Sequence, residues 1–196
     1  MNFSPLLFTV ITTLMFLSSW AQPFLPGQIH YGRNNYIEYR VGDLPVIITA
    51  PHGGYLEPTE IADRNCSGCV YGRDLYTQEM VKEIDTAFMQ SIGGRPHIII
   101  NRLARIKLDA NREIVEAAQG NQWAEQAWYE FHEFTEHAHD TVEAQFGRGL
   151  HIDLHGHGHT IQRLELGYLL SRTNLQLPDG VLNGAFYINK SSLKTG

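Results

Sequence analysis

The stretch GLHIDLHGHGH, residues 149–159, holds four histidines and one aspartate directly after an apolar run that is typical of a strand. Imidazole nitrogen and carboxylate oxygen are common zinc ligands in proteins. Two interpretations compete: a metal site at the carboxyl end of a sheet strand, or a polar loop that is rich in histidine without binding anything. The choice depends on whether other loops bring matching side chains to the same place.

Three polar loops, each following an apolar and β-branched segment, carry the side chains suited to chemistry. The segments and their loop residues are, in chain order, 44–50 with His52, 96–101 with Arg105, Asp109, Asn111 and Arg112, and 150–154 with Asp153, His155, His157 and His159. In an open α/β sheet, the loops at the carboxyl ends of the strands converge and bind ligands. The sequence therefore predicts that these loops meet in one site.

His52 and His155 are the predicted zinc ligands, because each follows a predicted strand that would hold it rigidly. The third ligand stays open between two acids: Asp74, at the expected start of a helix, is preferred, and Glu57, five residues after His52, is the alternative. Asp153 lies two residues before His155, so both share one face of an extended strand, and its carboxylate could orient the imidazole. Three protein ligands suffice for a catalytic zinc, which keeps one position open for water.

Hydrophobic periodicity places these residues in an alternating α/β pattern. Continuous or alternating apolar runs predict strands, and apolar residues recurring near a period of 3.6 predict helices. The predicted strands are 36–41, 44–50, 96–101, 150–154 and 162–171, and the predicted helices are 74–91, with Asp74 as N-cap or first-turn acid, and 121–146. Strands that alternate with long helices indicate an α/β sandwich with a mixed, mostly parallel sheet.

Length and charge limit the organisation and the partners of the chain. The 196 residues suggest one domain. A formal net charge of −6, with no block of lysine or arginine, disfavours a nucleic-acid partner. The final residues show no typical closing element, so we expect the domain over residues 22–196 to be incomplete.

Residues 1–21 have the pattern of a signal peptide, with an apolar core followed by small residues up to Ala21. An uncleaved membrane anchor is the alternative, but the apolar run is short for a span. We expect a secreted or periplasmic protein that starts near Gln22 and has no membrane contact after cleavage. In such an oxidising compartment, Cys66 and Cys69 are expected to form a small disulfide loop.

Four segments, taken in order, resemble motifs of the N-formylglutamate amidohydrolase family: PHGGYLEP (51–58), RDLYTQE (73–79), RIKLDANR (105–112) and HIDLHGH (151–157). The likeness spans residues 45–170. This family has the wider zinc carboxypeptidase and aspartoacylase-like fold. The resemblance implies a three-layer, phosphorylase/hydrolase-like α/β sandwich with one zinc ion.

The resemblance also implies an activity, the zinc-dependent hydrolysis of the amide bond of a small, carboxylate-bearing N-acyl amino acid by a metal-activated water. Glu165, in the segment LELG, resembles the general base, and an apolar wall beside it predicts a raised pKa. Asn111 and Arg112 are expected to grip the substrate carboxylate, and Arg105 to polarise the scissile carbonyl. Arg112 could instead pair with an acid at the next helix start. The alternative function is a catalytically inactive secreted binding protein that keeps the fold.

Overall fold

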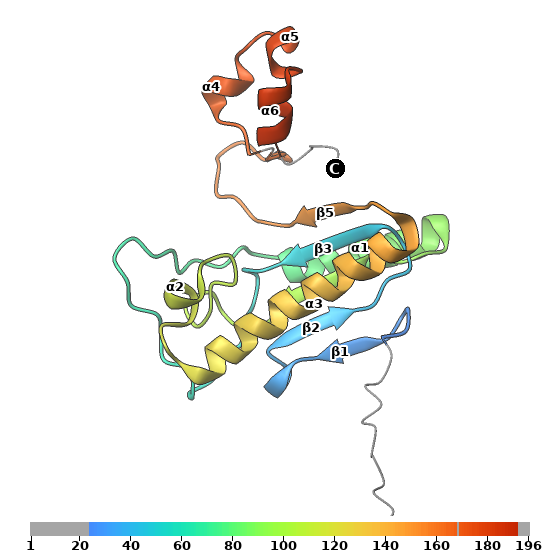
Figure 1. Cartoon of the computed structure of the whole chain (residues 1–196). Helices are drawn as coiled ribbons and strands as arrows, with labels where there is room; N and C mark the ends of the chain where they lie inside the picture. The colour runs from blue at the N-terminus through green and yellow to red at the C-terminus, as the bar shows by residue number, and fades with distance from the viewer. Residues whose placement is uncertain (1–23, 168, 192–196) are drawn as a thin grey trace, which may run out of the picture. The chain divides into compact units, whose positions relative to one another are not determined.

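The structure is a computed structural model that describes residues 24–167 and 169–191. The predicted signal peptide, residues 1–21, lies outside these residues. The chain divides into two compact units between Gly156 and His157. The first unit contains a sheet and the two longest helices, and the second contains three short helices (Figure 1). No helix in the described part of the chain has the length and apolarity needed to cross a membrane.

A five-stranded mixed sheet forms the centre of the first unit. Its strands are β1 (Ile29–Tyr31), β2 (Ile37–Arg40), β3 (Val46–Ala50), β4 (His97–Asn101) and β5 (Leu150–Asp153). The order across the sheet is β1-β2-β4-β3-β5. Strands β4, β3 and β5 are parallel, whereas β1 and β2 are antiparallel to their neighbours. Four predicted strands are therefore confirmed, β1 is an additional strand, and the sheet stays open rather than closing into a barrel.

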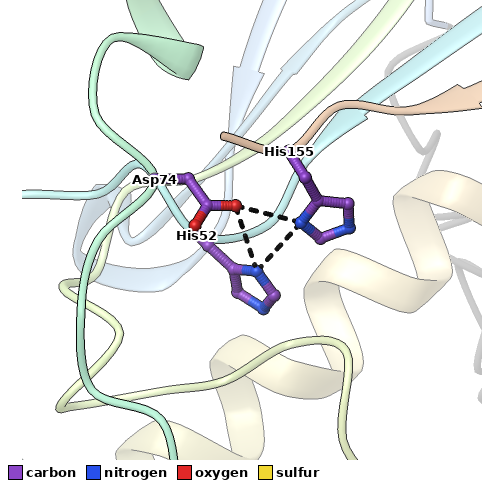
Figure 2. Close-up of side chains that lie close together, drawn as sticks. All are labelled: His52, Asp74 and His155. Carbon is purple, nitrogen blue, oxygen red and sulfur yellow. Dashed lines mark hydrogen bonds and ion pairs between the residues drawn. The ribbon is translucent and has the colours of Figure 1, made fainter. Parts of the chain in front are cut away.

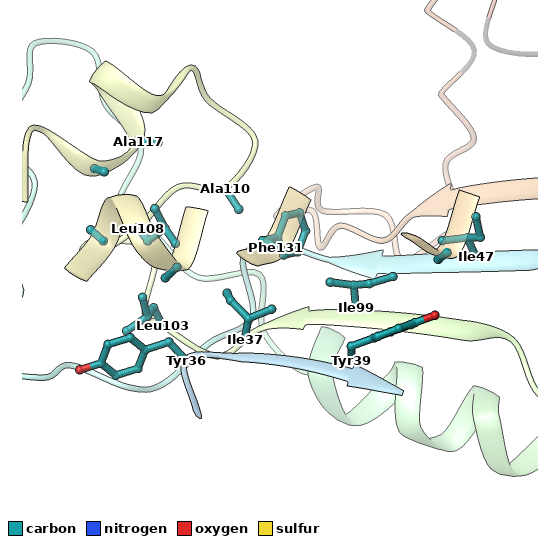
Figure 3. Close-up of a cluster of buried hydrophobic side chains, with 14 of the residues drawn as sticks. Tyr36, Ile37, Tyr39, Ile47, Ile99, Leu103, Leu108, Ala110, Ala117 and Phe131 are labelled. Carbon is teal, nitrogen blue, oxygen red and sulfur yellow. The ribbon is translucent and has the colours of Figure 1, made fainter. Parts of the chain in front are cut away.

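Helices cover both faces of this sheet (Figure 1). They are α1 (Thr77–Ile92), α2 (Ile114–Ala118) and α3 (Gln122–Phe146), with a short 3-10 helix, η1 (Arg33–Asn35). On one face, side chains of α3 and the sheet form the larger apolar cluster (Figure 3), which includes Ile37, Tyr39, Ile47, Ile99, Ala127 and Phe131. On the other face, α1 and the sheet form a smaller cluster, which includes Ile48, Ala50, Val81, Ile84, Ile98 and Ile100.

Strands β3 and β4 have continuous apolar sequences because both of their faces are covered. Ile47 and Ile99 belong to the cluster with α3, whereas their neighbours Ile48 and Ile98 belong to the cluster with α1. Since β3, β4 and β5 run parallel, their carboxyl ends lie at the same edge of the sheet. The three loops with candidate site residues therefore leave from one edge, as predicted.

Helix α1 begins at Thr77, three residues after the predicted start. Tyr76 takes the N-cap position with a left-handed φ of 65°, and its side chain makes no capping hydrogen bond. Asp74 therefore precedes the helix, and the prediction that it is an N-cap or first-turn acid is wrong. Its backbone N–H instead donates to the carbonyl oxygen of His52 at 3.1 Å, which ties Asp74 to the loop after β3.

The long loop before α1 is held by a disulfide and by a buried arginine. Cys66 and Cys69 form the disulfide that the sequence predicts. Arg64 is only 4% exposed, and its guanidinium donates to the carbonyl oxygens of Val70 at 2.8 Å and Arg105 at 3.0 Å. Charge-assisted hydrogen bonds of this kind are the stronger ones in proteins. They fix the irregular segment that leads into α1.

The predicted strand over 162–171 is wrong. In the described residues of this segment, the chain forms bends and irregular structure. Leu164 and Leu166 are 82% and 65% exposed, so the apolar alternation does not face a core. Alternation alone does not make a strand, because a strand also needs a pairing neighbour. The helices of the second unit are α4 (Arg172–Leu175), α5 (Asp179–Leu182) and α6 (Ala185–Lys190).

Candidate metal centre

His52, Asp74 and His155 come together at the carboxyl edge of the sheet (Figure 2). His52 lies two residues after β3, and the carbonyl oxygen of the intervening Pro51 accepts a hydrogen bond from Asn101 Nδ2 at 2.8 Å. This bond anchors the His52 loop to the end of β4. His155 lies two residues after β5, and Asp74 reaches the site through its backbone hydrogen bond to His52. Each side chain is thus attached to the end of a strand or to a loop that is bonded to one.

Two glycines allow the loops to approach one another closely. A Cβ atom on Gly53 would lie 2.3 Å from Thr77 Oγ1 at the start of α1. A Cβ atom on Gly156 would lie 3.3 Å from Cα and Cβ of Asp74. A side chain at Gly53 would therefore collide with the first residues of α1. The glycines around the histidines therefore have a steric role in assembling the site.

The three side chains direct one atom each toward a common point (Figure 2). The Nδ1 atoms of His52 and His155 are 3.2 Å apart, and Asp74 Oδ2 lies 3.6 Å from the first and 3.0 Å from the second. Zinc bonds of roughly 2.0–2.2 Å in a tetrahedral arrangement place neighbouring ligand atoms about 3.3 Å apart. The triangle of donor atoms therefore matches one face of a zinc tetrahedron, and the residues present fit a zinc ion with a fourth position free.

A carboxylate holds the far side of each imidazole. His52 Nε2 lies 2.6 Å from Asp109 Oδ1, and His155 Nε2 lies 2.8 Å from Asp153 Oδ2. A carboxylate that accepts from Nε2–H favours the tautomer in which Nδ1 presents its lone pair to a metal. Two such lone pairs 3.2 Å apart repel each other unless a proton on one of the nitrogens or a metal cation lies between them. The same arrangement at both histidines is the one that a metal centre needs.

Comparison with protein-family models, with curated proteins and with solved structures finds no match for the chain. The assignment of these residues therefore depends on their geometry and chemistry. The resemblance to the N-formylglutamate amidohydrolase family stays a prediction.

Asp109, the acid that holds His52, is itself held by two guanidinium groups. It is 1% exposed, and its Oδ2 accepts from Arg105 Nε at 2.9 Å and lies 3.7 Å from a terminal nitrogen of Arg64. Asp109 therefore holds Arg105 of its own loop and also orients a ligand. Arg64 was not predicted, because a lone arginine in an irregular segment gives no periodic or motif signal.

Asp153, the acid that holds His155, accepts two further hydrogen bonds. Thr49 Oγ1 donates to Asp153 Oδ1 at 2.7 Å, and Asn111 Nδ2 donates to Asp153 Oδ2 at 2.6 Å. Thr49 lies directly opposite Asp153 in the parallel pairing of β3 with β5. The predicted orientation of His155 by Asp153 is therefore confirmed, while Thr49 was missed because register between strands is not visible in the sequence.

The structure separates the other predicted site residues into two groups. Arg105 and Asn111 contact the carboxylates that hold the two histidines. Arg112 is 46% exposed, and its Nε pairs with Glu116 at 3.2 Å. This is the alternative interpretation of Arg112, in which it pairs with an acid at the next helix start. Glu57 is exposed and does not belong to the group of ligand atoms, in which Asp74 is the third member.

Glu165 lies in the second unit. Its Oε1 accepts from Arg163 Nε at 2.7 Å and lies 2.9 Å from His159 Nδ1, and with His157 these residues form a second, exposed group of candidate ligand atoms. The hydrogen bonds from His159 and Arg163 lower the pKa of Glu165. The expected raised pKa is therefore wrong, because the segment is not an apolar strand and the carboxylate is solvated and paired. Its role in catalysis stays a prediction.

Burial and hydrogen bonding shift the pKa values of the metal centre in opposite directions. Burial raises the pKa of Asp74, but hydrogen bonds from His155 and His52 outweigh it and hold that pKa well below its usual range. The same balance lowers the pKa of Asp109. Hydrogen bonds to Asp153 and Asp74 raise the pKa of His155 from 6.5 to about 9. His155 is therefore a cation at neutral pH in the metal-free protein, held between two carboxylates.

Zinc binding near neutral pH is expected to release at least about one proton, because His155 must lose its Nδ1 proton before that nitrogen binds a metal. Between about pH 7 and pH 10 the number released should fall by about one, since the pKa of His155 is about 9. Titration calorimetry in buffers of different ionisation enthalpy counts these protons. A count that does not change with pH would contradict the raised pKa.

The raised pKa of His155 also makes the stability of the metal-free protein depend on pH. The pKa of His155 is about 9 in the folded protein and 6.5 in the unfolded chain, so protonation of His155 favours the folded state. This contribution to the free energy of unfolding is fully present below pH 6.5 and is lost as the pH rises through about 9.

Proposed function

We propose that this chain is a zinc-dependent amidohydrolase that acts on a small, carboxylate-bearing N-acyl amino acid, as the resemblance to N-formylglutamate amidohydrolases implies. The observation that carries the proposal is the triangle of ligand atoms from His52, Asp74 and His155, with both imidazoles oriented by carboxylates. The helices on both faces of the mixed sheet are compatible with the three-layer, phosphorylase/hydrolase-like fold that the proposal includes.

The charges around the centre favour a divalent cation and an anionic substrate. Asp74, Asp109 and Asp153 provide three carboxylates, while Arg64 and Arg105 provide two guanidinium groups. Once His155 has lost its proton to make way for a metal, both imidazoles are neutral and the site has one negative charge in excess. A divalent ion would change this to one positive charge, which attracts a carboxylate substrate into an otherwise acidic protein.

The chain's own residues have distinct roles in this proposal. A bound zinc would polarise an acyl carbonyl and lower the pKa of a coordinated water to about 7. Arg105 binds Asp109 through Nε and has further N–H groups that can donate to the scissile carbonyl oxygen. Asn111 lies beside His155, and the exposed Arg112 would exchange Glu116 for the substrate carboxylate.

Hydrolysis assays with the zinc-loaded protein test the function. N-formylglutamate should be cleaved, and an analogue whose free carboxylates are converted to amides should be cleaved at least about 30-fold more slowly, as expected for loss of a charge-assisted contact. Equal rates on both substrates would show that the carboxylate is not recognised. Stoichiometric zinc without hydrolysis of either substrate would favour the inactive binding protein.

Glu165→Gln tests whether this carboxylate is the general base. The variant should fold and keep zinc, and kcat should fall by about 100-fold, the lower end of the range for acid–base groups. Glu133→Gln, at an exposed position on α3, is the matched control and should leave kcat unchanged. If Glu165→Gln retains the wild-type kcat, another group takes the proton.

A further inference from the structure

A line of hydrogen bonds continues from the metal centre across the face of the sheet. Asp153 holds His155 through Oδ2 and accepts from Thr49 Oγ1 through Oδ1 at 2.7 Å. Thr49 Oγ1 lies 3.1 Å from His151 Nε2, and His151 Nδ1 lies 3.0 Å from His139 Nε2. The line therefore joins β5, β3 and α3, and neither distal histidine was singled out from the sequence.

The proton positions along this line follow from its inner end, at Asp153. The carboxylate of Asp153 accepts from Asn111, from His155 and from Thr49, so the single hydrogen of Thr49 is used for it. Thr49 Oγ1 must then accept from His151 Nε2–H, which leaves His151 Nδ1 to accept from His139 Nε2–H. Burial lowers the pKa of His151, which keeps this imidazole neutral as the arrangement requires. Every donor thus points toward Asp153.

A surface cavity lies at the outer end of the line. Its volume is about 200 Å³, and His139, His151 and Glu143 are among its lining residues. His139 and Glu143 are four residues apart on α3, so they share one face of that helix. The two histidines are therefore placed between solvent and the carboxylate that orients a metal ligand.

We propose that His151 and His139 are positioning residues of the metal centre. They hold Thr49 so that its hydroxyl donates to Asp153, and Asp153 in turn keeps the Nε2–H of His155 and leaves Nδ1 for the metal. This inference rests on the proposed zinc site, but it concerns residues that touch neither the metal nor the substrate. Outer partners of this kind set metal affinity by orienting the ligands in advance.

His151→Leu tests the proposal through zinc affinity, measured by competition with a chromophoric chelator. The variant should bind zinc about tenfold more weakly, the lower end of the range for outer partners. His151→Gln, which keeps an N–H donor at a similar reach, should restore most of the loss. His137→Leu is the matched control, because His137 lies on α3 and packs against the rings of Phe24 and Tyr39, outside the line.

A second readout separates orientation from general loss of stability. In the zinc-loaded wild type, the Nε2–H proton of His155 should be a slowly exchanging NMR signal, and it should exchange faster in His151→Leu but not in His137→Leu. Thr49→Val, which removes only the hydroxyl, should weaken zinc binding as much as His151→Leu does. It replaces His151→Leu in the test if that variant does not fold. Wild-type affinity in both variants overturns this proposal alone, whereas a wild type that binds no zinc overturns the metal centre itself.

Discussion

A His155→Ala protein is expected to bind zinc about 1,000-fold more weakly than the wild type. Zinc sites in proteins have binding free energies of about 10–16 kcal/mol, so one of three ligands accounts for roughly 4 kcal/mol, or nearly three decades of affinity. His155 Nδ1 is also the atom nearest to both other ligand atoms, at 3.2 Å and 3.0 Å. Titration calorimetry or chelator competition measures the difference directly.

His157→Ala is the matched control for this experiment. It removes the same side chain two residues later, in the second unit, where His157 Nε2 contacts the carbonyl oxygen of Arg163. Zinc affinity should be unchanged in this variant. Stoichiometric zinc retained at wild-type affinity by a folded His155→Ala protein would remove His155 from the ligand set.

Asp109→Ala is expected to lower the free energy of unfolding of the metal-free protein by about 3–5 kcal/mol, the usual cost of breaking a buried ion pair. The carboxylate is 1% exposed and contacts His52, Arg105 and Arg64. Its removal leaves the buried guanidinium of Arg64 without its anionic partner and His52 Nε2 without an acceptor. Urea unfolding monitored by circular dichroism measures this loss.

Asp63→Ala provides the comparison for Asp109→Ala. Asp63 pairs with the buried Lys107 at 2.7 Å, but its own side chain is 61% exposed, and the ammonium keeps its hydrogen bond to the carbonyl oxygen of Ile61 when Asp63 is removed. The expected loss is therefore no more than about 1 kcal/mol. Zinc affinity should fall in Asp109→Ala by about 10- to 100-fold and remain unchanged in Asp63→Ala. Equal stability of the two variants would show that Asp109 is not the centre of a buried charge network.

Strong local patterns in the sequence predict the centre of the fold. β3 and β4 are apolar at nearly every position because helices cover both faces, and this makes them recognisable as buried strands. His52 follows such a strand, and His155 follows β5, which is exposed but pairs in parallel with β3. The rule that parallel strands present their carboxyl ends together is then enough to pair the two histidines. The histidine-rich stretch is thus explained for His155, which lies at the strand end, and not for His157, which belongs to the second unit.

Contacts that depend on tertiary structure could not be predicted from local sequence patterns. Asp74 reaches the site through a backbone hydrogen bond to His52, not through the helix start that first suggested it. The supporting roles of Arg64 and Thr49 depend on a loop path and a strand register that no local pattern encodes. The segment 162–171 alternates like a strand, but pairing partners decide whether alternation becomes a strand.

The most direct test of the account is anomalous diffraction at the zinc absorption edge from crystals of the zinc-loaded protein. We expect one strong peak roughly 2.0–2.2 Å from His52 Nδ1, His155 Nδ1 and a carboxylate oxygen of Asp74. A protein that shows no zinc between these three residues, or zinc only at His157, His159 and Glu165, would contradict it.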